Sequence, residues 1–231
     1  RRILRYASVG LAATVVVLAV SIVTSLTVDL GPSVRETAER EGSKYIERPL
    51  HIGALGIHLL SGKVRVEDVR IDGVHDNDRP FFTARWIDVR LDWAPAAARK
   101  PDFTISSVEM TDWQMLVERW EGGHNFPRFV HDDGRPKQPR PFTVTLRGLR
   151  AHRGQFTFED HETPWGVICP NLDIWIGNTP SYRGTAEFSG GQVSIQQFAP
   201  MSARMKAQFA IDGPRIHLDR IDMDTDGATT V

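Results

Sequence analysis

The densest group of polar side chains in this sequence is the run Glu159-Asp160-His161-Glu162, with His152 upstream of it. Carboxylates and imidazoles bind divalent metals, or act as general acids and bases, when their side chains converge on one point. This run follows the alternating segment from Gln155 to Phe158, and neighbouring residues of a strand point to opposite faces. The sequence therefore predicts a solvated turn here, with no metal and no cofactor.

The rest of the sequence has none of the common signatures of an active site. It contains no Gly-x-Ser-x-Gly elbow, no phosphate-binding loop, no dinucleotide fingerprint and no Cys-x-x-Cys pair. A further polar group, His124 with His131-Asp132-Asp133, falls in or beside a proline-rich stretch where charge is expected anyway. We therefore predict that the chain is not an enzyme and has no catalytic residues.

The tryptophans and the single cysteine are better explained by packing than by chemistry. Trp93 and Trp113 are in phase with the apolar residues of their strands, which predicts core or groove lining rather than sugar-stacking platforms. Cys169 has no second cysteine with which to form an internal disulfide, and it lies within an apolar strand pattern. These residues indicate a fold that is stabilised by side-chain packing.

The elements that would position any site are strands, and one apolar pattern recurs among them. Apolar residues stand at positions i, i+2, i+5 and i+7, close to a Gly, Asp or Asn turn. Alternation with a period of two is typical of a half-buried strand, and a slip of one residue is what a β-bulge produces. We expect each slip to appear as a bulge or bend that curves the sheet. The copies are Val64/Val66/Val69/Ile71, Phe103/Ile105/Val108/Met110, Val144/Leu146/Leu149/Ala151, Val167/Cys169/Leu172/Ile174 and Ile216/Leu218/Ile221/Met223.

A long uncharged segment precedes the strands. The 23 residues from Tyr6 to Val28 carry no charge and follow Arg1, Arg2 and Arg5. As a helix this segment is about 35 Å long, enough to span a bilayer. The arginines predict a cytoplasmic N-terminus, with the remaining chain across the membrane. A signal peptide cleaved near Ser21 or Ser25 is the alternative.

The sequence divides into five parts. We predict an anchor at 1–29, a short helix at 30–46 that begins with a Ser33/Glu36 capping box, and a first β unit at 47–125. A proline-rich linker at 126–141 leads to a second β unit at 142–231. A start without Met, and an end directly after a strand, predict that this unit continues in a longer protein. The first thirty residues carry three arginines and one aspartate, a net charge of +2, so the formal total of −1 leaves −3 for the rest, which rules against a broad nucleic-acid face.

One short helix is too little to cover the apolar face of so many strands. Segments such as Ile87 to Trp93 and Met201 to Ile211 alternate cleanly, as one-sided strands of antiparallel sheets do. The sheet can fold on itself as a closed β-sandwich, or it can curl into a groove that something other than protein covers. Composition does not separate the two, and periodicity alone favours the sandwich slightly.

The order of these signals resembles the AsmA-like family of bacterial envelope proteins. The resemblance rests on the anchor, the short helix, Arg48 to Gly53 and Leu59 to Ile71. It continues through Pro80-Phe81 with Ala84 to Leu91, then Ile105 to Met110, the turn Glu121 to Asn125, and Phe142 to Asp160. Such proteins are thought to form β-grooves that conduct phospholipid between membranes. The resemblance therefore implies an elongated, curved antiparallel sheet of the β-groove type.

The resemblance also implies a function and a location. We expect a single-pass inner-membrane protein, mostly periplasmic, that acts in phospholipid transport or outer-membrane maintenance. Its partners would be phospholipid acyl chains, the inner membrane and envelope proteins, but no nucleic acid. The alternative is a protein-binding β-sandwich scaffold for envelope assembly. The expected lipid lining is Val64, Val66, Ile87, Val89, Leu91, Val108, Met110, Met205, Phe209 and Ile211.

Overall fold

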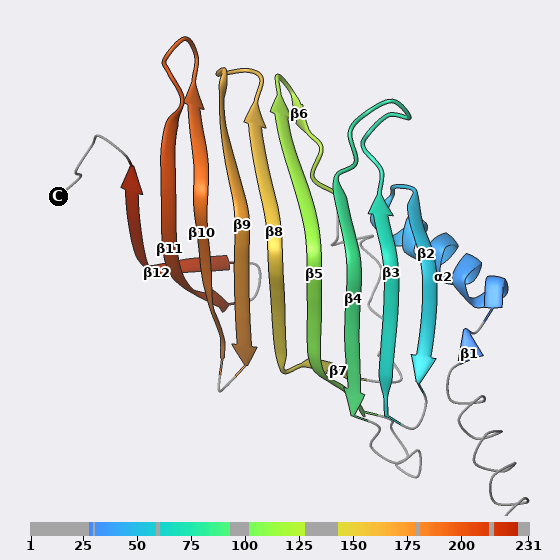
Figure 1. Ribbon diagram of the computed structural model, residues 1–231. Helices are drawn as coiled ribbons and strands as arrows, with labels where there is room; N and C mark the ends of the chain where they lie inside the picture. The colour runs from blue at the N-terminus through green and yellow to red at the C-terminus, as the bar shows by residue number, and fades with distance from the viewer. Residues whose placement is uncertain are drawn as a thin grey trace, which may run out of the picture.

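One curved sheet, with a helix beside its first strands, makes up the computed structural model (Figure 1). The structure describes residues 28–29, 31–58, 61–92, 102–127, 143–178, 181–212 and 215–225. Its elements are β1 (Val28–Asp29), α2 (Gly31–Ile46), β2 (Leu50–His58), β3 (Lys63–Ile71), β4 (Phe82–Asp92), β5 (Asp102–Trp120), β6 (Gly123–His124), β7 (Thr143–Leu146), β8 (Gly148–Asp160), β9 (Trp165–Asn178), β10 (Tyr182–Ile195), β11 (Met201–Asp212) and β12 (Arg215–Thr225).

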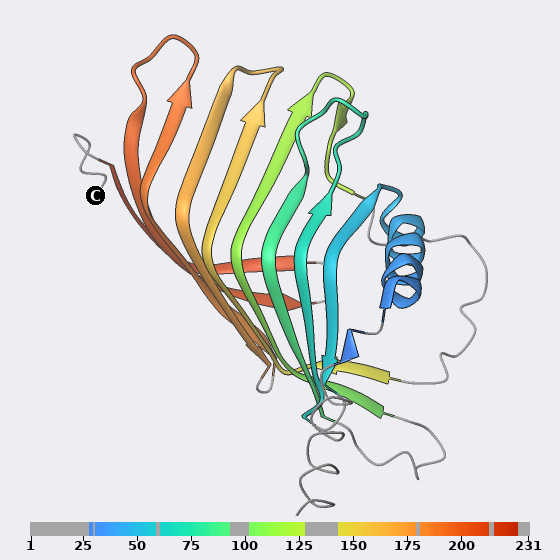
Figure 2. The ribbon, with the colours of Figure 1, turned by 45° about the vertical axis from the view of Figure 1, so that its right-hand side comes forward.

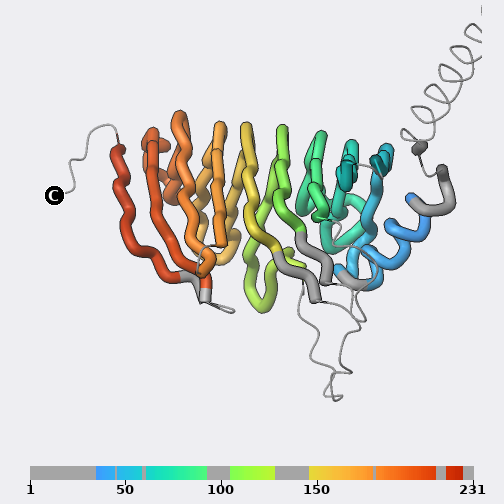
Figure 3. The backbone as a smooth tube through the Cα atoms, turned by 90° about the horizontal axis from the view of Figure 1, so that it is seen from below, coloured from blue at the N-terminus to red at the C-terminus, as the bar shows by residue number. Residues whose placement is uncertain are grey.

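The strands lie in the order β1-β2-β3-β4-β5-β8-β9-β10-β11-β12, and β6 and β7 both pair with β5. The strands of the two predicted β units thus belong to one sheet. The first and last strands of the described chain do not pair with each other, so the sheet is open, and the closed β-sandwich is wrong. Seen from below, the strands stand side by side in one layer, with α2 near one end and β12 at the other (Figure 3).

The centre of the sheet corrects the prediction of a purely antiparallel arrangement. Strand β5 pairs in parallel with both β7 and β8, from Asp102 opposite Thr143 to Arg119 opposite Asp160. The physical reason is the place where the chain enters the sheet again. Thr143, the first residue of β7, lies opposite Asp102, the first residue of β5, so β7 and β8 run in the same direction as β5.

The predicted slips are confirmed as irregularities of the backbone. Asp68 and Asn171 have positive φ angles of 51° and 50°. Ser106 and Asp219 are extra residues at shifts in register. Arg147 interrupts the strand and separates β7 from β8. Each slip lets the apolar side chains before and after it face the same side of the sheet.

Several irregularities line up across the sheet. Asp68, Asp112, Arg153 and Asn171 all have positive φ, and they lie at neighbouring levels of β3, β5, β8 and β9. Figure 2 shows the strands bending near their middle, all in the same direction. This row of aligned backbone irregularities curves the sheet into a trough whose axis runs across the strands, from β2 towards β12.

Replacing one bulge residue tests this account of the curvature. Asn171→Val is expected to lower the free energy of unfolding by about 1–2 kcal/mol, because the left-handed conformation is costly for a residue with a branched Cβ. Asn171→Gly removes that strain and should stay close to wild type. Urea unfolding of the three proteins measures the difference. Equal stability of the Val and Gly variants would contradict a strained bulge at this position.

Helix α2 covers part of the exposed edge of β2. The Glu39 carboxylate accepts a hydrogen bond from the backbone N–H of Ile52 at 2.6 Å, and the Ser43 hydroxyl accepts one from Leu50 at 2.9 Å. Arg35 donates to the carbonyl of Gly53 at 2.9 Å. These bonds satisfy backbone groups that an edge strand otherwise offers to other chains. The helix begins at Gly31, so the prediction that Ser33 is its N-cap is wrong.

Within the described residues, no helix has the length and apolar character needed to cross a membrane. The predicted span from Tyr6 to Val28 lies outside those residues, apart from Val28. Val28 and Asp29 form β1, which pairs with Ile57 and Gly56 of β2. The predicted linker at 126–141 likewise lies outside them beyond Pro127.

Candidate functional site

One face of the sheet is apolar across its whole width. The register aligns one residue from each successive strand into rows, and residues of a row share a face. One row is Ile57, Val64, Val89, Val108, Leu149, Ile176, Gly184, Phe209 and Leu218. The next is Leu55, Val66, Ile87, Met110, Ala151, Ile174, Ala186, Ala207 and Ile221. Both rows run from β2 to β12 without a polar side chain.

This apolar face is the concave one. In Figure 2, α2 lies on the side towards which the strands curve. A Cβ added to Gly42 of α2 would lie 2.4 Å from Cδ2 of Leu50, so this glycine lets the helix approach the leucine closely. Leu50 packs against the cluster of buried residues on the apolar face. Side chains on a concave surface converge. This convergence explains how a single layer of strands buries the side chains at its centre.

The floor of the trough is a packed cluster. Its buried members are Val69, Ala84, Trp113, Ala151, Cys169, Leu172, Phe188 and Ala203. The predictions that Trp113 is a core or lining residue and that Cys169 is a small apolar strand residue are confirmed. Burial raises the pKa of the Cys169 thiol to about 11, because the thiolate is poorly solvated there. Trp93 lies outside the described residues.

The structure places all the predicted lining residues on this face. They belong to β3, β4, β5 and β11 and are Val64, Val66, Ile87, Val89, Leu91, Val108, Met110, Met205, Phe209 and Ile211. The prediction missed the part of the lining that β8, β9 and β10 supply, including Leu149, Ile174 and Phe188. The recurring pattern already contained Leu149 and Ile174, so that signal was sufficient to find them.

The convex face carries charged side chains in cross-strand pairs. Arg65 donates two hydrogen bonds to the Asp88 carboxylate, both at 2.7 Å, and Arg153 donates two to Asp112 at 2.6 and 3.0 Å. These bonds lower the pKa of both carboxyl groups. Because Arg65 and Arg153 both have an acidic partner, the charges are balanced in this part of the face, which is exposed to water.

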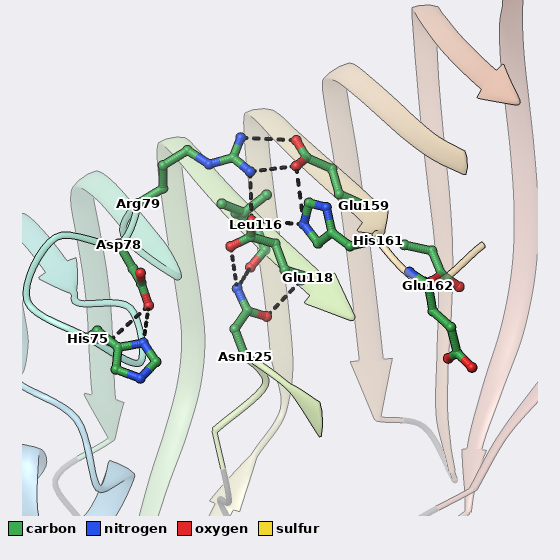
Figure 4. Close-up of polar contacts among 10 residues, drawn as sticks. His75, Asp78, Arg79, Leu116, Glu118, Asn125, Glu159, His161 and Glu162 are labelled. Carbon is green, nitrogen blue, oxygen red and sulfur yellow. Dashed lines mark hydrogen bonds and ion pairs between the residues drawn. The ribbon is translucent and has the colours of Figure 1, made fainter. Parts of the chain in front are cut away.

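The polar run singled out in the sequence lies at the end of β8 (Figure 4). Glu159 and His161 are two residues apart and approach Glu118 of β5, so ligand atoms of the three lie within 4.8 Å of one another. Asp160 instead accepts a hydrogen bond from Arg119 at 3.2 Å. The prediction that neighbouring side chains of the run point in different directions is correct. It missed that Glu159 and His161, two residues apart, both approach Glu118 of β5.

Arg79 occupies this cluster. Its guanidinium donates to Glu159 at 3.0 Å and to Glu118 at 2.7 Å, while His161 Nε2 lies 3.3 Å from Glu118 Oε1. These hydrogen bonds raise the pKa of Arg79 and lower that of Glu159. Arg79 thus connects the segment between β3 and β4 to the ends of β5 and β8. The carboxylates of Glu118 and Glu159 are both paired with its guanidinium.

The Arg79 cluster makes stability depend on acidity. The folded-state pKa of Glu159 lies below its ordinary value of 4.5, so its contribution is present above that pH and is lost as the pH falls through the folded-state value. Arg79→Gln is expected to cost about 1 kcal/mol or less at neutral pH and to weaken the acid dependence, with Arg79→Lys in between. Urea unfolding over a pH series measures this. An unchanged acid dependence in Arg79→Gln would count against the ion pair.

Comparison of the chain with protein-family models and with curated proteins finds no match to either.

Proposed function

We propose that this chain binds phospholipid acyl chains in its concave trough and carries phospholipid between the inner and outer membranes, without covalent chemistry. One observation supports this most strongly. The rows of apolar side chains run from β2 through β3, β4, β5, β8, β9, β10 and β11 to β12, and the trough stays open rather than closing on a second sheet. An open apolar surface is stabilised by a ligand that removes it from water, at about 25 cal/mol per Å².

The dimensions of the trough suit a lipid tail. Neighbouring strands are about 4.8 Å apart, so the path from β2 to β12 is roughly 40 Å long. An acyl chain reaches through one leaflet, about half of a hydrocarbon core roughly 30 Å thick. The trough therefore has room for more than one chain length in sequence along its axis, while a headgroup stays in water above the open side.

The position of β1 supports a membrane-tethered arrangement. β1 pairs with β2 at one end of the sheet, so the uncharged segment that precedes it joins the protein at that end. In the proposed arrangement this segment anchors the chain in the inner membrane and the trough extends through the periplasm. The resemblance of the sequence to the AsmA-like family supports the same location.

Native mass spectrometry of the full chain, purified in a mild detergent, tests the proposal. We expect the protein to carry copurified phospholipid, released as intact lipid on collisional activation. Delipidated protein should take lipid back from phosphatidylethanolamine that is added in mixed detergent micelles. A chain that never carries lipid under either condition would overturn the proposal and favour a scaffold that binds envelope proteins.

A further inference from the structure

The turn between β10 and β11 differs from the other turns along the same edge of the sheet. That edge also holds the β3–β4 connection with Asp76, Asp78 and Arg79, the β5–β6 turn with Glu121, and the β8–β9 turn with His161 and Glu162 (Figure 1). A quarter of all residues in the chain are charged, yet the sixteen from Phe188 to Ala203 carry no charge. This stretch covers the end of β10, the turn and the start of β11.

Apolar side chains project from this hairpin into water. Phe198, at the turn, is 73% exposed, and Ile195 and Met201 beside it are 40% and 39% exposed. Trp165, which pairs with Ile195 across β9 and β10, is 38% exposed. Large apolar side chains at a protruding turn are unfavourable in water, so their grouping points to a surface that covers them.

Hydrogen bonds hold the turn in its projecting form. The backbone N–H of Phe198 donates to the carbonyl of Ile195 at 2.9 Å, and the N–H of Gln196 donates to the carbonyl of Pro164 at 2.6 Å. The second bond ties the turn to the neighbouring β8–β9 turn. Phe198 is therefore presented on a fixed backbone and does not depend on a mobile loop for its exposure.

The hairpin is also continuous with the trough. Phe188 and Ala203 belong to the buried cluster on its floor, and Val193 packs against that cluster. Val193 pairs with Met201, and Ile195 lies one step beyond on the same face. An uninterrupted apolar strip thus leads from the floor of the trough over its rim to Phe198.

We propose that the β10–β11 turn inserts into the surface of a lipid bilayer and forms the place where acyl chains pass between that bilayer and the trough. Aromatic and aliphatic side chains on a firm turn partition into the interfacial region of a membrane. The stretch from Phe188 to Ala203 has no basic residue. Insertion therefore depends on apolar contact rather than on attraction to anionic lipid. The inference rests on the proposed lipid-binding function, but the two can fail separately.

A fluorophore at position 198 tests the insertion directly. Cys169 is the only cysteine, so Phe198→Cys in a Cys169→Ala background accepts an environment-sensitive label at one place. The labelled full chain is reconstituted in phosphatidylcholine vesicles, with acyl-chain nitroxide lipids as quenchers. We expect the fluorescence emission of the label to shift to the blue and to be quenched by the nitroxide lipids, and we expect high salt to reverse neither effect. Trp175→Cys is the matched control, because Trp175 is 46% exposed but lies on the convex face, and its label should remain in water.

Transfer measurements separate this inference from the function on which it rests. Phe198→Ser is expected to slow phospholipid transfer between vesicles about tenfold or more, since burying a phenylalanine side chain contributes that much to partitioning. Its lipid content by native mass spectrometry should equal that of wild type. A label at position 198 that stays in water, on a protein that carries lipid, would overturn bilayer insertion and leave this turn for a protein partner.

Discussion

Val89→Glu is expected to abolish copurification of phospholipid with the full chain while leaving the sheet folded. Val89 lies on the apolar face between Val64 of β3 and Val108 of β5, and it is only half-buried. A longer glutamate side chain can therefore reach water in the empty trough. When lipid is bound, the same carboxylate would lie among methylene groups at a cost of about 3 kcal/mol, or about a hundredfold in affinity.

A charge on the opposite face of the same strand is the matched control. Thr83 of β4 points to the convex face, where Arg70 and Gln114 are its cross-strand neighbours. Thr83→Glu adds the same carboxylate without placing it in the trough and should leave the bound lipid unchanged. Native mass spectrometry gives the lipid content, and circular dichroism the fold. Equal loss of lipid in both variants would contradict a binding surface confined to one face.

Phe209→Glu extends the test to the other half of the sheet. Phe209 of β11 lies in the same row as Val89, and a Cβ added at Gly184 of β10 would be 2.5 Å from its ring. If one continuous trough holds the lipid, this distant substitution should remove lipid as Val89→Glu does. Retention of lipid in Phe209→Glu would restrict the binding surface to the first strands.

Gly154→Ala is expected to destabilise the fold by about 3 kcal/mol, the upper end of the usual cost of overpacking a core. A Cβ at position 154 would lie 2.1 Å from Cε2 and 2.3 Å from Cζ2 of Trp113. Trp113 is only 3% exposed in the floor of the trough, so its ring has little space in which to move. Urea unfolding of the variant measures the loss.

Two further variants show whether that loss comes from the tryptophan. Trp113→Ala should itself cost about 3–5 kcal/mol, but adding Gly154→Ala to it should cost little more, because the colliding ring is gone. Gly56→Ala is the control within a strand, since an added Cβ there meets no atom within 4 Å. Additive costs of the two trough substitutions would show that Gly154 is required for another reason.

The local pattern of apolar residues determined much of this protein. Period-two alternation identified the strands and their apolar faces, and the slip between Val66 and Val69 or between Cys169 and Leu172 identified the backbone irregularities at Asp68 and Asn171. These features could be predicted because side-chain direction along a strand depends only on neighbouring residues. All the expected lining residues fell on one face for the same reason.

Contacts between distant segments were decided by the tertiary structure. The parallel pairing of β5 with β8, the open form of the sheet and the approach of Arg79 to Glu159, eighty residues away, have no local signature. In the sequence, Gly154 looks like an ordinary turn residue. Only the structure shows that Trp113 of the neighbouring strand lies against it. Periodicity says which side chains share a face, but it does not determine which strands pair or how far the sheet curves. The apolar face therefore followed from the sequence alone, whereas its form as an open trough with a charge-free hairpin on the rim came from strand pairing and from backbone irregularities that align across the sheet.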